Sequence, residues 1–203
     1  MASARPERGG LVFVLSGPSG VGKDSVMNCL REDTLCLHFC VTATTRRQRP
    51  GERHGVNHYF VERERFLAMA DAGELLEWAL VHENYYGVPL HEVRTAFTEA
   101  RDPLMRVDVQ GAASVRARLP QAVLIFLAPE SVEDLSPRLH ERGTETAEEV
   151  ALRLTNARRE MEALPSFDYV VVNRQGRLAE SVAAVRAIVV AERCKVEPRW
   201  VTV

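Results

Sequence analysis

A glycine-rich segment directly after an apolar run constrains the fold of this chain more than any other feature. Leu11–Ser16 is apolar enough for a buried strand, and a helix is expected to begin near Asp24 and Ser25. Between them, glycines let successive backbone N–H groups converge on one point, where a helix N-terminus adds positive partial charge. This strand–turn–helix context predicts a phosphate-binding loop for a nucleoside triphosphate. The residues expected to hold its phosphates are Gly17, Pro18, Ser19, Gly20, Val21, Gly22, Lys23, Asp24 and Ser25.

The position after the loop lysine departs from the usual pattern. Phosphate loops place Ser or Thr there as a magnesium ligand, whereas this chain has Asp24, and Ser25 comes one place later. The Asp24 carboxylate can be interpreted as a Mg²⁺ ligand, because hard cations favour oxygen. It can also be interpreted as an acidic residue that the helix dipole stabilises, and the sequence slightly favours this second interpretation.

Composition and charge exclude several classes of protein. The chain has 203 residues, 46% of them hydrophobic, which is enough for one domain with its own core. A net charge of −2 argues against non-specific binding to nucleic acid or anionic membranes. No apolar run reaches bilayer length, and the first ten residues lack the apolar segment of a secretory signal. We therefore expect a cytoplasmic protein, with an organelle matrix as the alternative, and no nucleic-acid or membrane partner.

The cysteines indicate neither a disulfide framework nor a metal site. They form no CxxC pair and have no histidine partner at metal-binding spacing, so reduced structural thiols are expected. The four residues are Cys29, Cys36, Cys40 and Cys194.

Apolar runs alternate with helical patterns along most of the chain, which predicts a mainly parallel sheet flanked by helices. The expected strands are Leu11–Ser16, Pro103–Val109, Ala122–Leu127 and Tyr169–Val172. The expected helices are Ser25–Arg31, Ala112–Leu119, Ser131–Glu141, Glu148–Leu164 and Leu178–Glu192.

One region breaks this alternation and predicts a second lobe. From His38 to about Leu90 the sequence is strand-like and turn-rich, with one helix near Arg63–Ala72. We expect a mixed α+β lobe over 41–99 and, because Gly143–Thr146 separates two Arg-rich helix ends, a helical lid over 137–154. The predicted core is then 11–40, 100–136 and 155–195, between a disordered tail 1–10 and a tail 196–203.

A second phosphate site is predicted in Thr42–Glu52. This segment contains three arginines and several hydroxyl groups, and Pro50-Gly51 closes it as a turn. Guanidinium groups bind phosphate through two parallel hydrogen bonds, which lysine cannot form. Next to a phosphate loop, such a segment favours a second anionic substrate over a solvated charged loop.

Two acidic residues lie in otherwise apolar strand patterns. Glu77 falls within Leu76–Val81 and Asp108 within Met105–Val109. A carboxylate inside a sheet needs hydrogen-bond partners, since burying it alone is costly. Salt bridges at strand ends are one explanation. The other is a bound guanine, whose adjacent N1–H and N2–H₂ groups a carboxylate accepts as a pair; such a site rejects other bases.

These motifs occur in the order found in guanylate kinases, and the sequence resembles that family from about Leu11 to Glu192. The phosphate loop and the Thr44–Glu52 block are followed by Glu77-Trp78-Ala79, Tyr85-Tyr86-Gly87, Asp108-Val109-Gln110-Gly111-Ala112, Arg142-Gly143-Thr144-Glu145 and Val170-Val171-Val172-Asn173. Asp24, Thr42–Thr45 and Arg106–Asp108 look closest to the plastid and mitochondrial type of plants and to some bacterial relatives. The resemblance implies a P-loop nucleoside monophosphate kinase-like fold and Mg²⁺-dependent transfer of phosphate from ATP to GMP. The oligomeric state, monomer or homo-oligomer, stays open.

The resemblance also implies roles for single residues. Lys23 would reach the ATP phosphates and Asn173 would lie near the adenine. The arginines expected to close over the transferring phosphoryl group are Arg138, Arg142 and Arg153. The residues expected to bind GMP are Thr42, Arg46, Arg49, Glu77, Tyr86 and Asp108.

Three positions depart from the family pattern. His58 stands where a tyrosine commonly contacts the GMP phosphate; it could donate the same hydrogen bond, with a pH dependence near its ordinary pKa of about 6.5. Val88 replaces a Ser or Thr that donates to the guanine oxygen, and Arg106 replaces an acid. On a strand Arg106 and Asp108 would share a face, so Arg106 is expected to supply the donor that Val88 lacks.

Two other functions fit parts of the sequence. Ribose 1,5-bisphosphate kinases also tend to carry Lys-Asp-Ser, Asn-His and Tyr-Gly-Val, as found here at residues 23–25, 57–58 and 86–88. Guanylate-kinase-like modules of scaffold proteins bind phosphopeptides, but they normally lose the loop lysine that this chain keeps as Lys23. The guanine-type acid pair and the Arg46–Glu52 block favour the nucleotide kinase over both.

Overall fold

A parallel five-stranded sheet forms the centre of the protein. The computed structural model describes residues 6, 9–32, 35–81, 83–135 and 147–203, with 147–150 by their backbone alone. The sheet has the order β10-β9-β2-β8-β3, and every neighbouring pair is parallel. The strands are β2 (Phe13–Ser16), β3 (Leu37–Phe39), β8 (Asp102–Arg106), β9 (Val123–Ala128) and β10 (Tyr169–Val172). The predicted fold class is confirmed.

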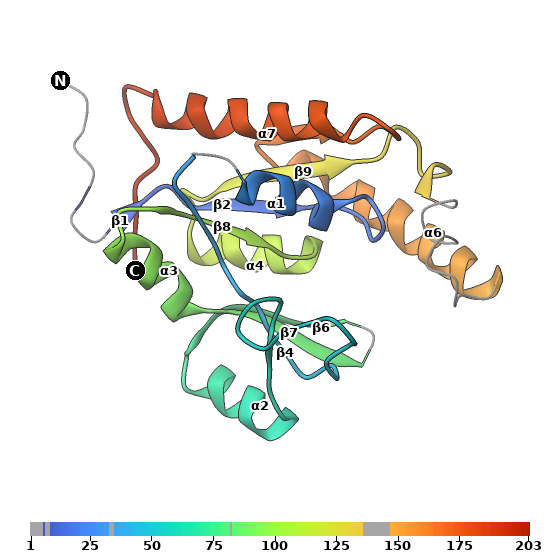
Figure 1. Cartoon of the computed structure of the whole chain (residues 1–203), viewed down its shortest axis with the longest axis horizontal. Helices are drawn as coiled ribbons and strands as arrows, with labels where there is room; N and C mark the ends of the chain where they lie inside the picture. The colour runs from blue at the N-terminus through green and yellow to red at the C-terminus, as the bar shows by residue number, and fades with distance from the viewer. Residues whose placement is uncertain (1–5, 7–8, 33–34, 82, 136–146) are drawn as a thin grey trace.

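Helices cover both faces of this sheet (Figure 1), and side chains that alternate along the strands divide the core between the two faces. Phe13 and Leu15 of β2 pack with one set of helices, and Val12 and Val14 pack with the other. The first set is α1 (Lys23–Arg31), α6 (Ala147–Glu162), which a 3₁₀ turn η1 (Leu164–Ser166) follows, and α7 (Leu178–Arg193). The second set is α3 (Leu90–Thr98) and α4 (Val109–Arg118). The helix α3 was not predicted.

Residues 43–89 form a separate antiparallel and mixed layer, below the core in Figure 1. Its sheet has the order β5-β4-β7-β6, and Phe66 and Met69 of its helix pack on Leu75. Its elements are β4 (Ala43–Thr44), β5 (Tyr59–Phe60), α2 (Arg63–Asp71), β6 (Leu75–Val81) and β7 (Asn84–Pro89). Most of the predicted lid, 137–154, and much of the predicted helix 131–141 lie outside the described residues.

A buried glutamate joins this lobe to the core. Glu92 of α3 accepts hydrogen bonds from Val41 N (3.0 Å) and from the Tyr59 hydroxyl (2.6 Å), and its Oε2 lies 2.9 Å from His38 Nε2. His38, Cys40 and Glu92 bring metal-ligand atoms within 4.8 Å of one another, contrary to the expectation that no cysteine has a histidine partner. Because both Glu92 oxygens already accept hydrogen bonds, we interpret the cluster as a structural joint.

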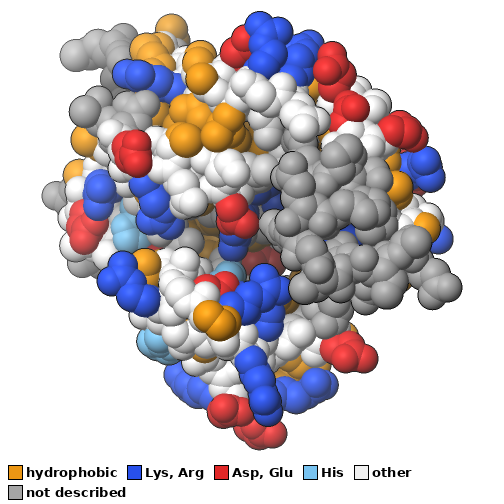
Figure 2. Space-filling model, turned by 45° about the vertical axis from the view of Figure 1, so that its right-hand side comes forward, with side chains coloured by type: hydrophobic (Ala, Val, Ile, Leu, Met, Phe, Trp, Pro, Cys, Tyr) orange, Lys and Arg blue, Asp and Glu red, His pale blue; other side chains and the backbone are white. Residues whose placement is uncertain are grey.

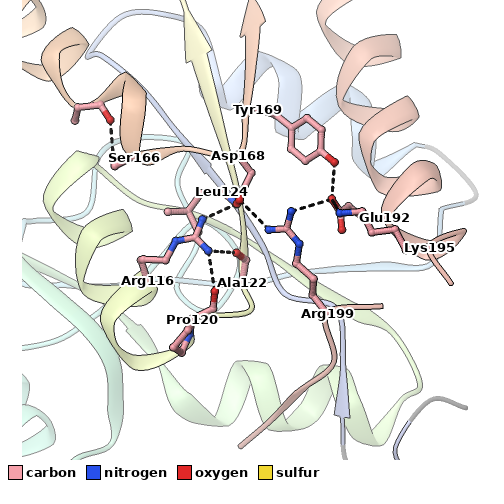
Figure 3. A network of polar contacts seen from close by, with 11 residues as sticks. Arg116, Pro120, Ala122, Leu124, Ser166, Asp168, Tyr169, Glu192, Lys195 and Arg199 are labelled. Carbon is pink, nitrogen blue, oxygen red and sulfur yellow. Dashed lines mark hydrogen bonds and ion pairs between the residues drawn. The ribbon is translucent and has the colours of Figure 1, made fainter. Parts of the chain in front are cut away.

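A short strand near each end of the sequence pairs with the other. β1 (Gly9–Gly10) lies antiparallel to β11 (Val201–Thr202), so the segments predicted as tails contribute a small sheet. Figure 3 shows the contacts that hold the C-terminal segment. Arg199 Nη1 lies 2.8 Å from Asp168 Oδ1, and Lys195 Nζ lies 2.7 Å from Glu192 Oε1. Within the described residues, no helix combines the length and the apolar character needed to cross a bilayer.

Candidate nucleotide-binding cleft

A cleft of about 1000 Å³ opens at the carboxyl end of β2, between the core and the lobe. Ligands of parallel sheets bind at this edge, where neighbouring connections diverge. In Figure 2 the surface is hollowed between the upper and lower parts of the molecule, and charged side chains gather at the rim. The cleft is lined by Ser19 to Ser25, Thr42, Arg46, Arg49, Glu52, His58, Tyr86, Arg106 and Asn173 among others.

The phosphate loop requires glycine at two positions. Gly17 has φ +137°, and a Cβ there would lie 2.1 Å from Leu127 O; Gly22, at φ +99°, caps helix α1. Lys23 Nζ donates to the loop's own carbonyl oxygens, at 2.5 Å to Gly17 and 3.0 Å to Pro18. Ser19 N donates to the Glu160 carboxylate of α6 at 3.3 Å. The loop N–H groups are therefore placed to bind anionic oxygen.

Asn173 supports the loop from behind. Its side chain is buried; Nδ2 donates to Val21 O (2.7 Å) and Oδ1 accepts from Ser181 Oγ (2.9 Å). Both polar atoms of the amide are thus engaged by the protein, while Asn173 also lines the cleft, and its expected position near the adenine stays a prediction. Arg174–Gly176 and Leu178 line the cleft beside it and were missed. Their position just after the last parallel strand was a signal that could have identified them.

Arg46 and Glu52 form a two-pronged ion pair in the lobe. Arg46 Nη2 lies 2.8 Å from Glu52 Oε1, and Nη1 lies 3.1 Å from Glu52 Oε2. This pairing lowers the pKa of Glu52 to about 2 and raises the pKa of Arg46. Glu52 also accepts from Arg49 N at 2.8 Å, which closes the turn. The pair fixes the Arg46 side chain and the backbone turn at Arg49, and both arginines line the cleft.

His58 lies deeper in the same wall and stays uncharged near neutral pH. Its Nδ1 is 2.7 Å from Thr42 Oγ1. Its ring packs edge to face against two neighbours, with ring centres 5.7 Å apart for Phe60 and 6.1 Å apart for Tyr86. Burial lowers the pKa of His58, and Arg46 lowers it further. The pH dependence expected near 6.5 therefore moves to more acidic conditions.

Two carboxylates meet in a smaller cavity of about 160 Å³ next to the cleft. Glu77 lies on β6 as predicted and is buried. Asp108 does not lie on a strand: β8 ends at Arg106, and Asp108 caps α4 by accepting from Gly111 N at 2.8 Å. The expectation that Arg106 and Asp108 share a strand face is therefore wrong. A Cβ at Gly111 would lie 2.6 Å from Glu77 Oε2, so glycine allows the acids to approach.

The ionised form of Glu77 is unfavourable in this cavity. Burial, and then the charge of Asp108, raise the pKa of Glu77 to about 8. Arg118, at the other end of α4, donates to the carbonyls of Leu75 (2.7 Å) and Leu76 (2.8 Å) and so ties α4 to β6. A ligand that donates two hydrogen bonds to Glu77 would relieve this cost.

The remaining predicted residues are placed as follows. Asp24 and Arg106 form an ion pair in the cleft. Arg153 lies half-buried on α6 and is not among the described residues that line the cleft. Arg138 and Arg142 lie outside the described residues.

Comparisons with known proteins agree with this geometry. The family model described as guanylate kinase matches residues 10–192. "Guanylate kinase 2, chloroplastic/mitochondrial" of Oryza sativa subsp. japonica is 46% identical over 95% of this chain and 68% of its own. The guanylate kinase of Shouchella clausii is 44% identical over 93% and 91%. The crystal structure of the Anaplasma phagocytophilum guanylate kinase covers 92% of this chain and 87% of its own, at 33% identity and a TM-score of 0.75. The chain therefore belongs to the guanylate kinase family.

Proposed function

We propose that the protein transfers the terminal phosphoryl group of ATP to GMP. The observation that carries this proposal is the Glu77–Asp108 pair, in a cavity that adjoins the phosphate-loop cleft. Guanine presents two adjacent donors to such acceptors, whereas adenine and the pyrimidines do not. A wrong base would leave buried carboxylates without partners, which is a strong basis for selectivity.

The charged residues divide between the two substrates. The phosphate loop and Lys23 bind the ATP phosphates, and Arg46 and Arg49 bind the phosphate of GMP. Because the GMP phosphate is already an ionised nucleophile, the protein supplies alignment and charge neutralisation rather than a base. Arg138, Arg142 and Arg153 are proposed to close over the transferring group and to exclude water.

Magnesium fits the oxygen-rich end of this cleft. Ser25 offers a hydroxyl group and Asp24 a carboxylate, but Arg106 already pairs with that carboxylate. We expect Mg²⁺ to be held mainly by nucleotide phosphates, with Ser25 as the available protein ligand. Bound there, the ion would neutralise charge between phosphates. Purine nucleotide metabolism, in the cytoplasm or an organelle matrix, is the proposed setting.

A coupled assay of ADP release tests the proposal. The enzyme is supplied with ATP, Mg²⁺ and one acceptor at a time: GMP, dGMP, AMP, UMP, CMP or ribose 1,5-bisphosphate. We expect turnover with GMP and none of comparable rate with AMP, UMP or CMP. Preference for ribose 1,5-bisphosphate, which the family relationship does not support, or no turnover with any acceptor, would refute it.

A further inference from the structure

Two unusual charged residues meet in the cleft. Asp24 stands where phosphate loops place Ser or Thr, and Arg106 is a cation at the end of the otherwise buried strand β8. The structure joins them as an ion pair. Asp24 belongs to the first turn of α1 and Arg106 is the last residue of β8. The pair therefore ties the phosphate loop to the central sheet.

Arg106 occupies the boundary between the two cavities. Among the described residues, the side chains that line both are Lys23, Thr42, Tyr86 and Arg106. The Arg106 side chain is 27% exposed, so an incoming anion can reach it. A guanidinium carries five N–H donors in a planar fork, and one carboxylate takes at most two along one edge. Arg106 thus keeps donors for a second anion while Asp24 stays bound.

We propose that Arg106 contacts the phosphate of GMP and that Asp24 is the positioning residue that aims it, rather than a ligand of magnesium. This inference rests on the proposed function. A guanidinium held by a carboxylate loses less conformational freedom when it binds phosphate than an untethered one. A magnesium ion bound to Asp24 would lie beside the Arg106 cation, and the two would repel each other. The ion pair therefore favours the positioning role.

Measuring GMP binding in the absence of magnesium distinguishes the positioning role of Asp24 from a role as magnesium ligand. A residue that acted only as a metal ligand would not affect GMP binding under this condition. Isothermal titration calorimetry would compare the wild type, Asp24→Asn, Arg106→Ala and the double variant. We expect Asp24→Asn to weaken GMP binding about tenfold in the wild-type background, equivalent to about 1.4 kcal/mol. In the Arg106→Ala variant the Asp24 carboxylate has no guanidinium to hold and only repels the phosphate. Asp24→Asn should therefore strengthen GMP binding in that background.

Two outcomes would overturn the inference: an equal effect of Asp24→Asn in both backgrounds, or no effect in the wild-type background. If Arg106→Ala does not fold, Arg106→Gln takes its place, since it keeps more of the side chain but lacks the charge. The exposed pair Arg65–Glu74, outside both cavities, is the control, and Arg65→Ala and Glu74→Gln should leave GMP binding unchanged. A wild type that does not bind GMP refutes the proposed function instead.

Discussion

Replacing Glu77 with glutamine should stabilise the protein while it weakens GMP binding. Glu77 has a pKa of 4.5 as an ordinary glutamate and about 8 in the fold. Near pH 7 and without nucleotide, the unfolded chain carries Glu77 ionised and the folded chain carries it mostly protonated. A pH of 7 lies roughly 2.5 units above the pKa of Glu77 in the unfolded chain. At about 1.36 kcal/mol for each unit, the raised pKa lowers the free energy of unfolding by about 3 kcal/mol.

The stability penalty depends on pH because the pKa of Glu77 is raised in the fold. Below about pH 4.5 both states are protonated and the penalty is absent; it grows as the pH rises and levels off above about pH 8, near 5 kcal/mol. Glutamine is neutral throughout, so the advantage of Glu77→Gln should follow the same curve. For a domain of this length, about 3 kcal/mol corresponds to a Tm higher by roughly 6–12 °C near pH 7.

Thermal unfolding without nucleotide, followed by circular dichroism at several pH values, measures this difference. Glu62→Gln is the matched control, because Glu62 is exposed and lies outside both cavities. GMP binding to Glu77→Gln should weaken at least about a hundredfold. The glutamine NH₂ group replaces one acceptor oxygen and would face an N–H group of guanine, so two hydrogen-bond donors would oppose each other. A Tm difference that does not change with pH would refute the reasoning.

Three further outcomes are expected. Lys23→Ala should lower kcat far more than it raises the KM for GMP, whereas Arg46→Ala should mainly raise that KM; steady-state kinetics with equal losses in both would contradict this division. Gly111→Ala should displace the Glu77 carboxylate, which a Cβ would approach to 2.6 Å, and so raise the KM for GMP but not for ATP. Deleting residues 199–203 removes β11 and the Arg199–Asp168 pair and should lower the Tm by roughly 5 °C, with activity at moderate temperature unchanged; an unaltered Tm would show that the pairing contributes nothing.

The parts of the site that were predictable lie in short contiguous segments. Phosphate binding requires glycines, a lysine and a strand–helix context within a few residues, and the Arg46–Glu52 block is equally local. The alternation of apolar runs and helical patterns likewise predicted a parallel sheet, because each crossover needs a helix. These features follow from local chemistry, so a single sequence is enough to find them.

The parts that were missed depend on where elements end or on distant contacts. Val107–Val109 alternates like a strand, but Asp108 ends it by capping α4 through Gly111 N. Helix α3 begins after Pro89 without a side-chain cap, so its start gives no signal. Asn173 supports Val21, which lies 152 positions earlier. The Asp24–Arg106 pair joins two residues that look like unrelated exceptions when only the sequence is read.

The pairing of β1 with β11 has a practical consequence for engineering. Gly9 and Gly10 precede β2, whereas the phosphate loop follows it, so β1 and β11 pair at the end of the sheet opposite the cleft. A fusion partner or a surface tether attached after β11 would begin on the side away from the cleft. The pairing of β1 with β11 also suits circular permutation, in which a linker joins these two strands and new ends are opened in an exposed turn outside both cavities, such as Gly73.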